Sequence, residues 1–148
     1  MTEKHVDLLY KDLSYQIRGA AIDVRKNYGL GHKEVLYQRA FAEELGFRKI
    51  SFQKEKAIRI FSPKTKKVIG SYQPDFIVDD KIIIELKALE KIPRKMFDQV
   101  YSYLRNSEYE LGFLINFNSN GVNIKRIIYT NDRKMRIQPK TEIKPNSQ

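Results

Sequence analysis

Residues 72–88 constrain the fold more than any other part of this 148-residue chain. Two short apolar runs rich in β-branched residues, at 76–78 and 82–84, flank the pair Asp79 and Asp80. Such runs around a short polar turn are typical of a β-hairpin. The second run is apolar at consecutive positions, which predicts a strand covered on both faces near the middle of a sheet.

The second strand of this hairpin continues into charged residues. Side chains alternate along a strand, so Glu85 and Lys87 share one face and Leu86 lies on the other. The hairpin brings Asp75, at the start of the preceding strand, beside Glu85. Buried charges are costly unless they are paired or bind a metal. The cluster therefore predicts either a divalent-cation site with a lysine beside it or an Asp–Lys–Glu salt bridge at the rim of the sheet.

The composition indicates a polyanionic partner and narrows the possible chemistry. Lys and Arg outnumber Asp and Glu by 28 to 18, a formal charge of +10, which favours nucleic acid as a partner. The absence of cysteine excludes disulfides, Cys-based zinc sites and iron–sulfur clusters. Only His5 and His32 could supply imidazole, so an all-protein zinc site is not expected. No apolar run reaches membrane-spanning length and no signal-peptide core is visible, so we expect a cytoplasmic protein without a membrane partner.

Two helices are predicted before the hairpin, over residues 8–28 and 32–45. Apolar residues recur every three or four positions in the first, and glycines follow it. Glu34 lies in the first turn of the second, where it either complements the helix dipole or supplies a third carboxylate to the cluster. Tyr37, one turn later, either hydrogen-bonds the site or packs in the core.

A basic turn and a third helix carry further candidate residues. Strands over 52–61 and 68–72 enclose Lys64, Lys66 and Lys67, which form either a solvated turn that protects a sheet edge or a phosphate contact. Pro93 suits the first turn of the third helix. On that helix Gln99 and Tyr103 lie one turn apart, and Arg94 and Lys95 near its start can contact a substrate backbone.

The order of elements predicts an α/β fold, a single-domain mixed β-sheet flanked by helices. The third helix between the Lys87 strand and a strand at 113–117 allows a parallel crossover, whereas the earlier strands pair as hairpins. A last strand covers 122–129. We expect residues 1–130 to form one domain and residues 131–148 a flexible basic tail.

Several short motifs resemble those of one nuclease superfamily. Pro74-Asp75 followed by Glu85-Leu86-Lys87 resembles the PD-(D/E)XK signature of metal-dependent nucleases. Residues 31–37 resemble the G-x-x-E-x-x-Y element of the GxxExxY protein family, a small branch of that superfamily. Residues 99–103 resemble the Q-x-x-x-Y helix motif of several branches. The resemblance covers roughly residues 12 to 130 in the same order.

This resemblance implies a restriction-endonuclease-like core and a nuclease that hydrolyses phosphodiester bonds in DNA with Mg²⁺, or with Mn²⁺. Asp75 and Glu85 then ligate the metal, with Glu34 as an additional ligand, directly or through water. Lys87 positions the attacking water and Gln99 orients that water or the phosphate. Tyr37 and Tyr103 support the site. Two alternatives remain: a non-catalytic nucleic-acid-binding module on the same fold, and a junction-resolving endonuclease that acts as a homodimer.

Overall fold

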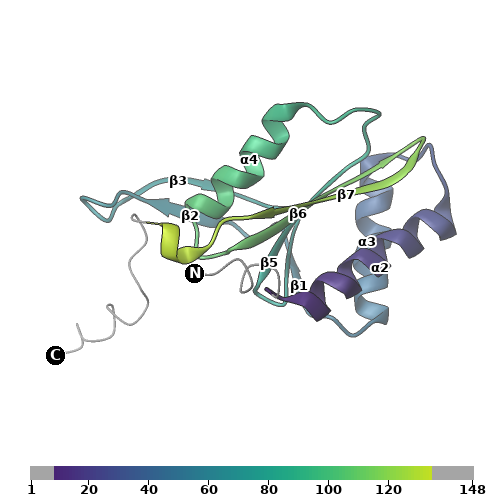
Figure 1. Cartoon of the computed structure of the whole chain (residues 1–148), viewed down its shortest axis with the longest axis horizontal. Coiled ribbons are helices and arrows are strands. Elements are labelled where there is room, and N and C mark those ends of the chain that lie inside the picture. The colour runs from purple at the N-terminus through teal and green to yellow at the C-terminus, as the bar shows by residue number, and fades with distance from the viewer. Residues whose placement is uncertain (1–8, 135–148) are drawn as a thin grey trace.

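The computed structural model describes residues 9–134, in which helices cover both faces of a mixed five-stranded sheet (Figure 1). This α/β arrangement is the predicted fold class. The elements are α2 (Lys11–Tyr28), α3 (Glu34–Phe47), β1 (Phe52–Lys54), β2 (Ile58–Phe61), β3 (Val68–Tyr72), β4 (Phe76–Val78), β5 (Ile82–Lys87), α4 (Arg94–Arg105), β6 (Leu111–Asn118), β7 (Gly121–Ile128) and the short 3₁₀ helix η1 (Asn131–Arg133).

Strand β5 occupies the centre of the main sheet, whose order is β1-β4-β5-β6-β7. It pairs antiparallel with β4 and parallel with β6, and α4 makes the crossover between the two parallel strands. Asp79 and Asp80 form the turn between β4 and β5, both with positive φ (51° and 52°). Both the hairpin and the crossover were predicted from the apolar runs and the Pro93 helix start.

The two faces of β5 pack against different elements. Ile82, Ile84 and Leu86 belong to the large apolar cluster that the sheet forms with α2 and α3. Ile83 points the other way, into a smaller cluster with Leu104 of α4 and with β3. Both faces are therefore covered, as the consecutive apolar positions predicted.

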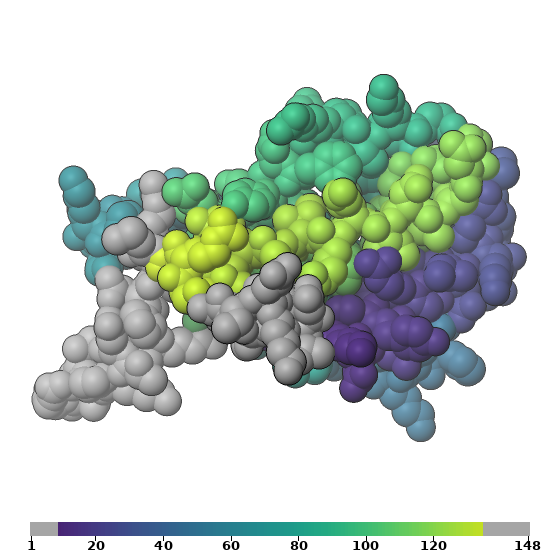
Figure 2. Space-filling view, in the orientation of Figure 1, coloured from purple at the N-terminus to yellow at the C-terminus, as the bar shows by residue number. Residues whose placement is uncertain are grey.

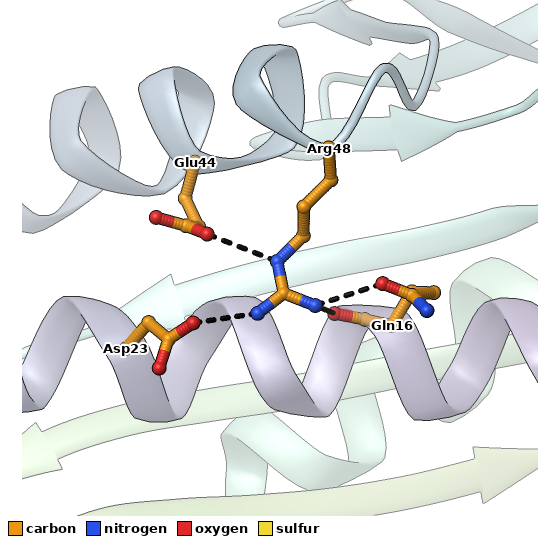
Figure 3. Close-up of polar contacts among 4 residues, drawn as sticks. All are labelled: Gln16, Asp23, Glu44 and Arg48. Carbon is orange, nitrogen blue, oxygen red and sulfur yellow. Dashed lines mark hydrogen bonds and ion pairs between the residues drawn. The ribbon is translucent and has the colours of Figure 1, made fainter.

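Helices α2 and α3 are joined by a polar network around Arg48, at the end of α3 (Figure 3). Its guanidinium donates to Asp23 Oδ2 at 2.6 Å, to Glu44 Oε2 at 3.0 Å and to Gln16 Oε1 at 2.8 Å. A Cβ atom at Gly19 would lie 2.9 Å from Arg48 Nη1, so the glycine leaves room for this side chain. The network fixes how the two helices lie on the sheet.

The prediction of one continuous strand over residues 52–61 is wrong. Its first part, β1, pairs with β4 in the main sheet, whereas β2 pairs only with β3 in a separate two-stranded ribbon. The chain turns between them at Glu55, which has φ of 52° and whose N–H donates to the Asp75 carbonyl at 3.2 Å. The ribbon therefore leaves the main sheet close to the charged cluster.

Ordered structure continues past residue 130. Helix η1 is followed by Lys134, whose ammonium donates to the carbonyls of Ser107 and Tyr109 at 3.0 and 2.7 Å. Burial lowers the pKa of Lys134 to about 8. The remainder of the predicted tail, 135–148, lies outside the described residues. Within residues 9–134 no helix is both long and apolar enough to cross a membrane.

Candidate active site

Asp75 and Glu85 face each other across the β4–β5 hairpin. The register pairs Phe76 with Ile84, so the next positions outward on the two strands are Asp75 and Glu85. The Leu86 N–H donates to Asp75 Oδ2 at 2.7 Å, which fixes the aspartate against β5. Asp75 lies close enough to the Glu85 carboxyl to raise its pKa. The structure thus brings together the two carboxylates that the alternation pattern placed on one face.

The surroundings of Glu85 favour its protonated form. Its side chain is buried, with 8% of the residue exposed. Burial first, and then the charge and hydrogen bond of Asp75, raise the pKa of Glu85 to about 8, while Lys87 opposes this shift. Burial beside Asp75 therefore favours the neutral form of Glu85 in the absence of a cation. A site that concentrates negative charge in this way also suits a bound cation.

Glu34 approaches the same region from helix α3. It is the first residue of that helix and is half-buried, and its Oε2 accepts from Gln38 Nε2 at 3.1 Å. Burial raises the pKa of Glu34, Lys87 opposes this, and Asp75 adds to it, so all three charges act on one another. Among residues 9–134, however, no three His, Asp or Glu side chains group closely enough to hold one metal ion. Glu34 therefore lies near the carboxylate pair, and its part as an additional ligand stays a prediction.

Tyr103 of helix α4 lies close enough to the carboxylates for their charge to act on it, and Gln99 lies one turn before it. The Tyr103 ring stacks on Tyr72 at 3.7 Å between centroids, and the Tyr72 hydroxyl donates to the Tyr103 carbonyl at 3.0 Å. Burial raises the pKa of Tyr103, and the negative charge of Glu85 adds to this, whereas a hydrogen bond from Gln99 lowers it. The phenol of Tyr103 therefore lies within electrostatic reach of Glu85, and Gln99 is held to it.

Tyr37 has a structural position. It is buried, its hydroxyl donates to the Gly29 carbonyl at 2.7 Å, and its ring stacks on Phe117 at 4.4 Å. The His32 N–H donates back to the same hydroxyl at 3.4 Å. Of the two roles left open by the sequence, packing is the one that these contacts describe. Tyr37 fixes the connection from which α3, and hence Glu34, begins.

The predicted basic contact residues lie in two exposed places. Arg94 and Lys95 occupy the first turn of α4, which follows the Lys87 strand after a short loop. Lys64, Lys66 and Lys67 lie in the β2–β3 turn and are exposed.

The sequence reasoning missed Asn116 on β6. It is the register partner of Lys87, is buried, and its side-chain amide pairs with the Leu89 backbone: Oδ1 accepts from the N–H at 2.9 Å and Nδ2 donates to the carbonyl at 2.7 Å. This amide extends the pairing of β5 beyond Lys87 and so fixes the chain that leads to α4. The available signal was an asparagine inside an apolar run, because a buried polar group needs partners.

Comparison with known proteins identifies the family. The family model of the PD-(D/E)XK nuclease superfamily matches residues 11–127, and the chain therefore belongs to this superfamily. A solved structure described as the crystal structure of SSO0001 is 17% identical, with a TM-score of 0.44, and the match covers 76% of this chain and 63% of that one. None of the curated proteins compared with the chain matches it.

Proposed function

We propose that this protein is a metal-dependent nuclease that hydrolyses phosphodiester bonds in DNA. The observation that carries the proposal is the Asp75–Glu85 carboxylate pair beside Lys87, in residues that resemble the superfamily signature. A salt-bridge rim was the alternative from sequence. Within residues 9–134 no ion pair joins Lys87 to either carboxylate, which favours a cation site over a salt bridge at the rim of the sheet.

The residues present fit a divalent cation. Mg²⁺ retains several waters and commonly binds through one or two protein carboxylates and the substrate phosphate, so a pair suffices. Burial first, and then repulsion from Asp75, raises the pKa of Glu85, and a bound cation relieves both the unpaired charge and the repulsion. We assign Asp75 and Glu85 as the ligands of Mg²⁺ or Mn²⁺, and Glu34 as a ligand through water.

The protein's own groups then orient the reaction. The bound cation supplies Lewis-acid polarisation of the phosphate and acidification of water. The Lys87 ammonium holds the attacking water and offsets the charge that develops on the phosphate. Asp75 keeps its orientation through the Leu86 N–H, and Gln99, held at Tyr103, orients the water or the phosphate.

The substrate assignment rests on charge. With a formal charge of +10, the chain attracts a polyanion, and we assign the exposed Arg94 and Lys95, at the start of α4, to contact its backbone. Within the superfamily we assign the chain to the GxxExxY branch, on the strength of Gly31, Glu34 and Tyr37. We place this enzyme in the cytoplasm.

The test is a cleavage assay on purified full-length protein. Linear, circular, single-stranded and branched DNA and RNA are incubated with Mg²⁺, with Mn²⁺ and with EDTA, alongside Asp75→Asn. We expect DNA products that require the metal and that vanish in the variant. A folded wild-type protein that binds DNA yet cuts none of these substrates is a non-catalytic module. A preference for branched DNA, together with a dimer in solution, identifies a junction-resolving enzyme.

A further inference from the structure

The β2–β3 ribbon, residues 58–72, forms an arm that projects from the body of the protein (Figure 1). It shares no strand with the main sheet. In the space-filling view it is the blue-teal projection at the end of the molecule away from α2 and α3 (Figure 2). At its base, Ile58, Ile60 and Tyr72 pack in the cluster with Leu104 of α4. The arm is therefore anchored on the face of the sheet that carries Glu85.

The arm carries only positive charge. Residues 57–74 include no Asp or Glu and four cations, which are Arg59, Lys64, Lys66 and Lys67. All four are exposed, and no carboxylate in the described part of the chain forms an ion pair with Arg59, Lys64 or Lys67. Lysines at an edge turn commonly prevent aggregation. A stretch of this length with cations and no acidic residue also presents a surface complementary to phosphates.

The turn at the tip is well ordered. Ser62 Oγ accepts from the N–H groups of Lys64 and Thr65 at 3.3 and 3.2 Å, and the Ser62 N–H donates to the Lys67 carbonyl at 2.8 Å. The Lys66 N–H donates to the Ser62 carbonyl at 2.9 Å. The tip lysines are thus presented on a fixed backbone, which reduces the entropy lost on binding.

Exposed apolar side chains lie beside these cations. Phe61 and Val68 are register partners that are 52% and 48% exposed, and Ile69, at the bulge next to them, is 64% exposed. A turn that is merely solvated needs no exposed phenylalanine, valine and isoleucine together. Cations flanking an apolar wedge match a nucleic-acid groove, where lysines contact phosphates and apolar groups contact sugars and base edges.

We propose that the β2–β3 arm grips double-stranded DNA on one side of the cutting site. This inference rests on the proposed nuclease function. Chain continuity supports it, since Tyr72 at the base of the arm is separated from Asp75 by only two residues. Five residues of β3 at about 3.3 Å each place the tip about 17 Å beyond Tyr72. At about 3.4 Å per base pair, that reach corresponds to about five base pairs of flanking duplex.

The test measures binding, so that it does not depend on cleavage. DNA affinity is measured against salt concentration in Ca²⁺ for wild type and for Arg59→Ala/Lys64→Ala/Lys67→Ala. The matched control, Lys11→Ala/Lys26→Ala/Lys125→Ala, removes the same charge from exposed positions elsewhere. Each lost phosphate contact makes the slope of log affinity against log salt less negative by about 0.9. The slope of the arm variant is therefore expected to be less negative than that of wild type by about 2 to 3, and the slope of the control variant to change little.

A second series shortens the duplex by single base pairs on one side of the cut and then on the other. We expect wild-type affinity to fall about tenfold or more when one flank drops below about five base pairs. Phe61→Ser/Val68→Ser and the arm triple variant are expected to lose this dependence. Equal salt slopes for the arm and control variants overturn the proposal. So does an arm variant whose affinity for single-stranded DNA falls as much as its affinity for duplex DNA.

Sedimentation separates a protein partner from DNA. If Phe61→Ser/Val68→Ser dissociates a dimer while the salt slope stays at the wild-type value, the arm is an interface between chains and the proposal is wrong. If wild type cuts no substrate but the arm variant still has a flatter salt slope, DNA binding by the arm is supported and the nuclease function is wrong. The two hypotheses are thereby distinguished.

Discussion

The two faces of strand β5 are built for different purposes. Toward α2 and α3 it presents Ile82, Ile84 and Leu86, which join an extensive apolar cluster. Toward α4 it presents Ile83 and then Glu85, where the apolar cluster is small and gives way to the carboxylate pair. Because successive side chains of a strand point to opposite faces, one strand can contribute to stability on one side and to chemistry on the other.

The division has an energetic reason. Burying Glu85 beside Asp75 opposes folding, since neither carboxylate finds a close cation within residues 9–134. The α2–α3 face offsets this penalty by burying large side chains such as Phe41. Substitutions on the two faces should therefore separate activity from stability.

The largest effect is expected on the charged face. Asp75→Asn and Glu85→Gln keep the side-chain shape but remove anionic charge, so cleavage should fall by about 10³-fold or more while the melting temperature holds or rises. Lys87→Ala should lose activity to a similar extent and spare metal affinity, measured by titration calorimetry. Asp98→Asn and Glu43→Gln are exposed controls that should leave activity unchanged.

The assignment of the charged face fails if Lys87→Ala cuts DNA as fast as wild type. It also fails if Asp75→Asn and Glu85→Gln unfold the protein without loss of activity per folded molecule, because that is the behaviour of a structural salt bridge.

The apolar face should show the opposite pattern. Phe41 is fully buried and packs edge-on against Phe76 at 5.2 Å between ring centroids. Phe41→Ala should lower the free energy of unfolding by about 3–5 kcal/mol in denaturant titrations. Phe47→Ala, on the same helix but 82% exposed, should change it by less than about 0.5 kcal/mol. If folded Phe41→Ala protein has lost cleavage at low temperature, the two faces are coupled rather than separate.

A pH titration in EDTA sharpens the same comparison. The pKa of Glu85 is raised from 4.5 to about 8, so the folded state binds this proton more tightly than the unfolded state. The resulting stabilisation is complete below about pH 4.5 and is lost as pH rises to about 8, at up to about 1.4 kcal/mol per pH unit. Glu85→Gln should remove this fall in stability, whereas Glu43→Gln should retain it. A wild-type curve with no difference from Glu85→Gln between pH 5 and 8 contradicts the raised pKa of Glu85.

The pairing of Asp75 with Glu85 was easier to predict from the sequence than the division of residues 52–61 into two strands of different sheets. Alternation along residues 82–87 and a short turn are local, so they placed Asp75 opposite Glu85 correctly. The break at Glu55, which sends β2 out of the sheet, depends on a backbone bond to Asp75 that no pattern in residues 52–61 encodes. Asn116 is likewise a tertiary feature, because its partner at Leu89 is 27 residues away.

Tyr37 and Tyr103 offer the finest test of the comparison, because both were predicted to support the site. The Tyr37 hydroxyl donates to the Gly29 carbonyl and not to a carboxylate. By contrast, Glu85 and Gln99 both influence the pKa of the Tyr103 phenol. Tyr37→Phe should cost about 1 kcal/mol of unfolding free energy and leave kcat within about twofold.

Tyr103→Phe should do the reverse, keeping stability within about 0.5 kcal/mol and lowering kcat several-fold, because Gln99, in its proposed orienting role, loses its partner at Tyr103. Tyr15→Phe, at an exposed position of α2, serves as the common control in denaturant and cleavage measurements. If Tyr37→Phe instead lowers kcat without loss of stability, its hydroxyl acts on the chemistry through Glu34. The connection that begins α3 then belongs to the site and not to the scaffold.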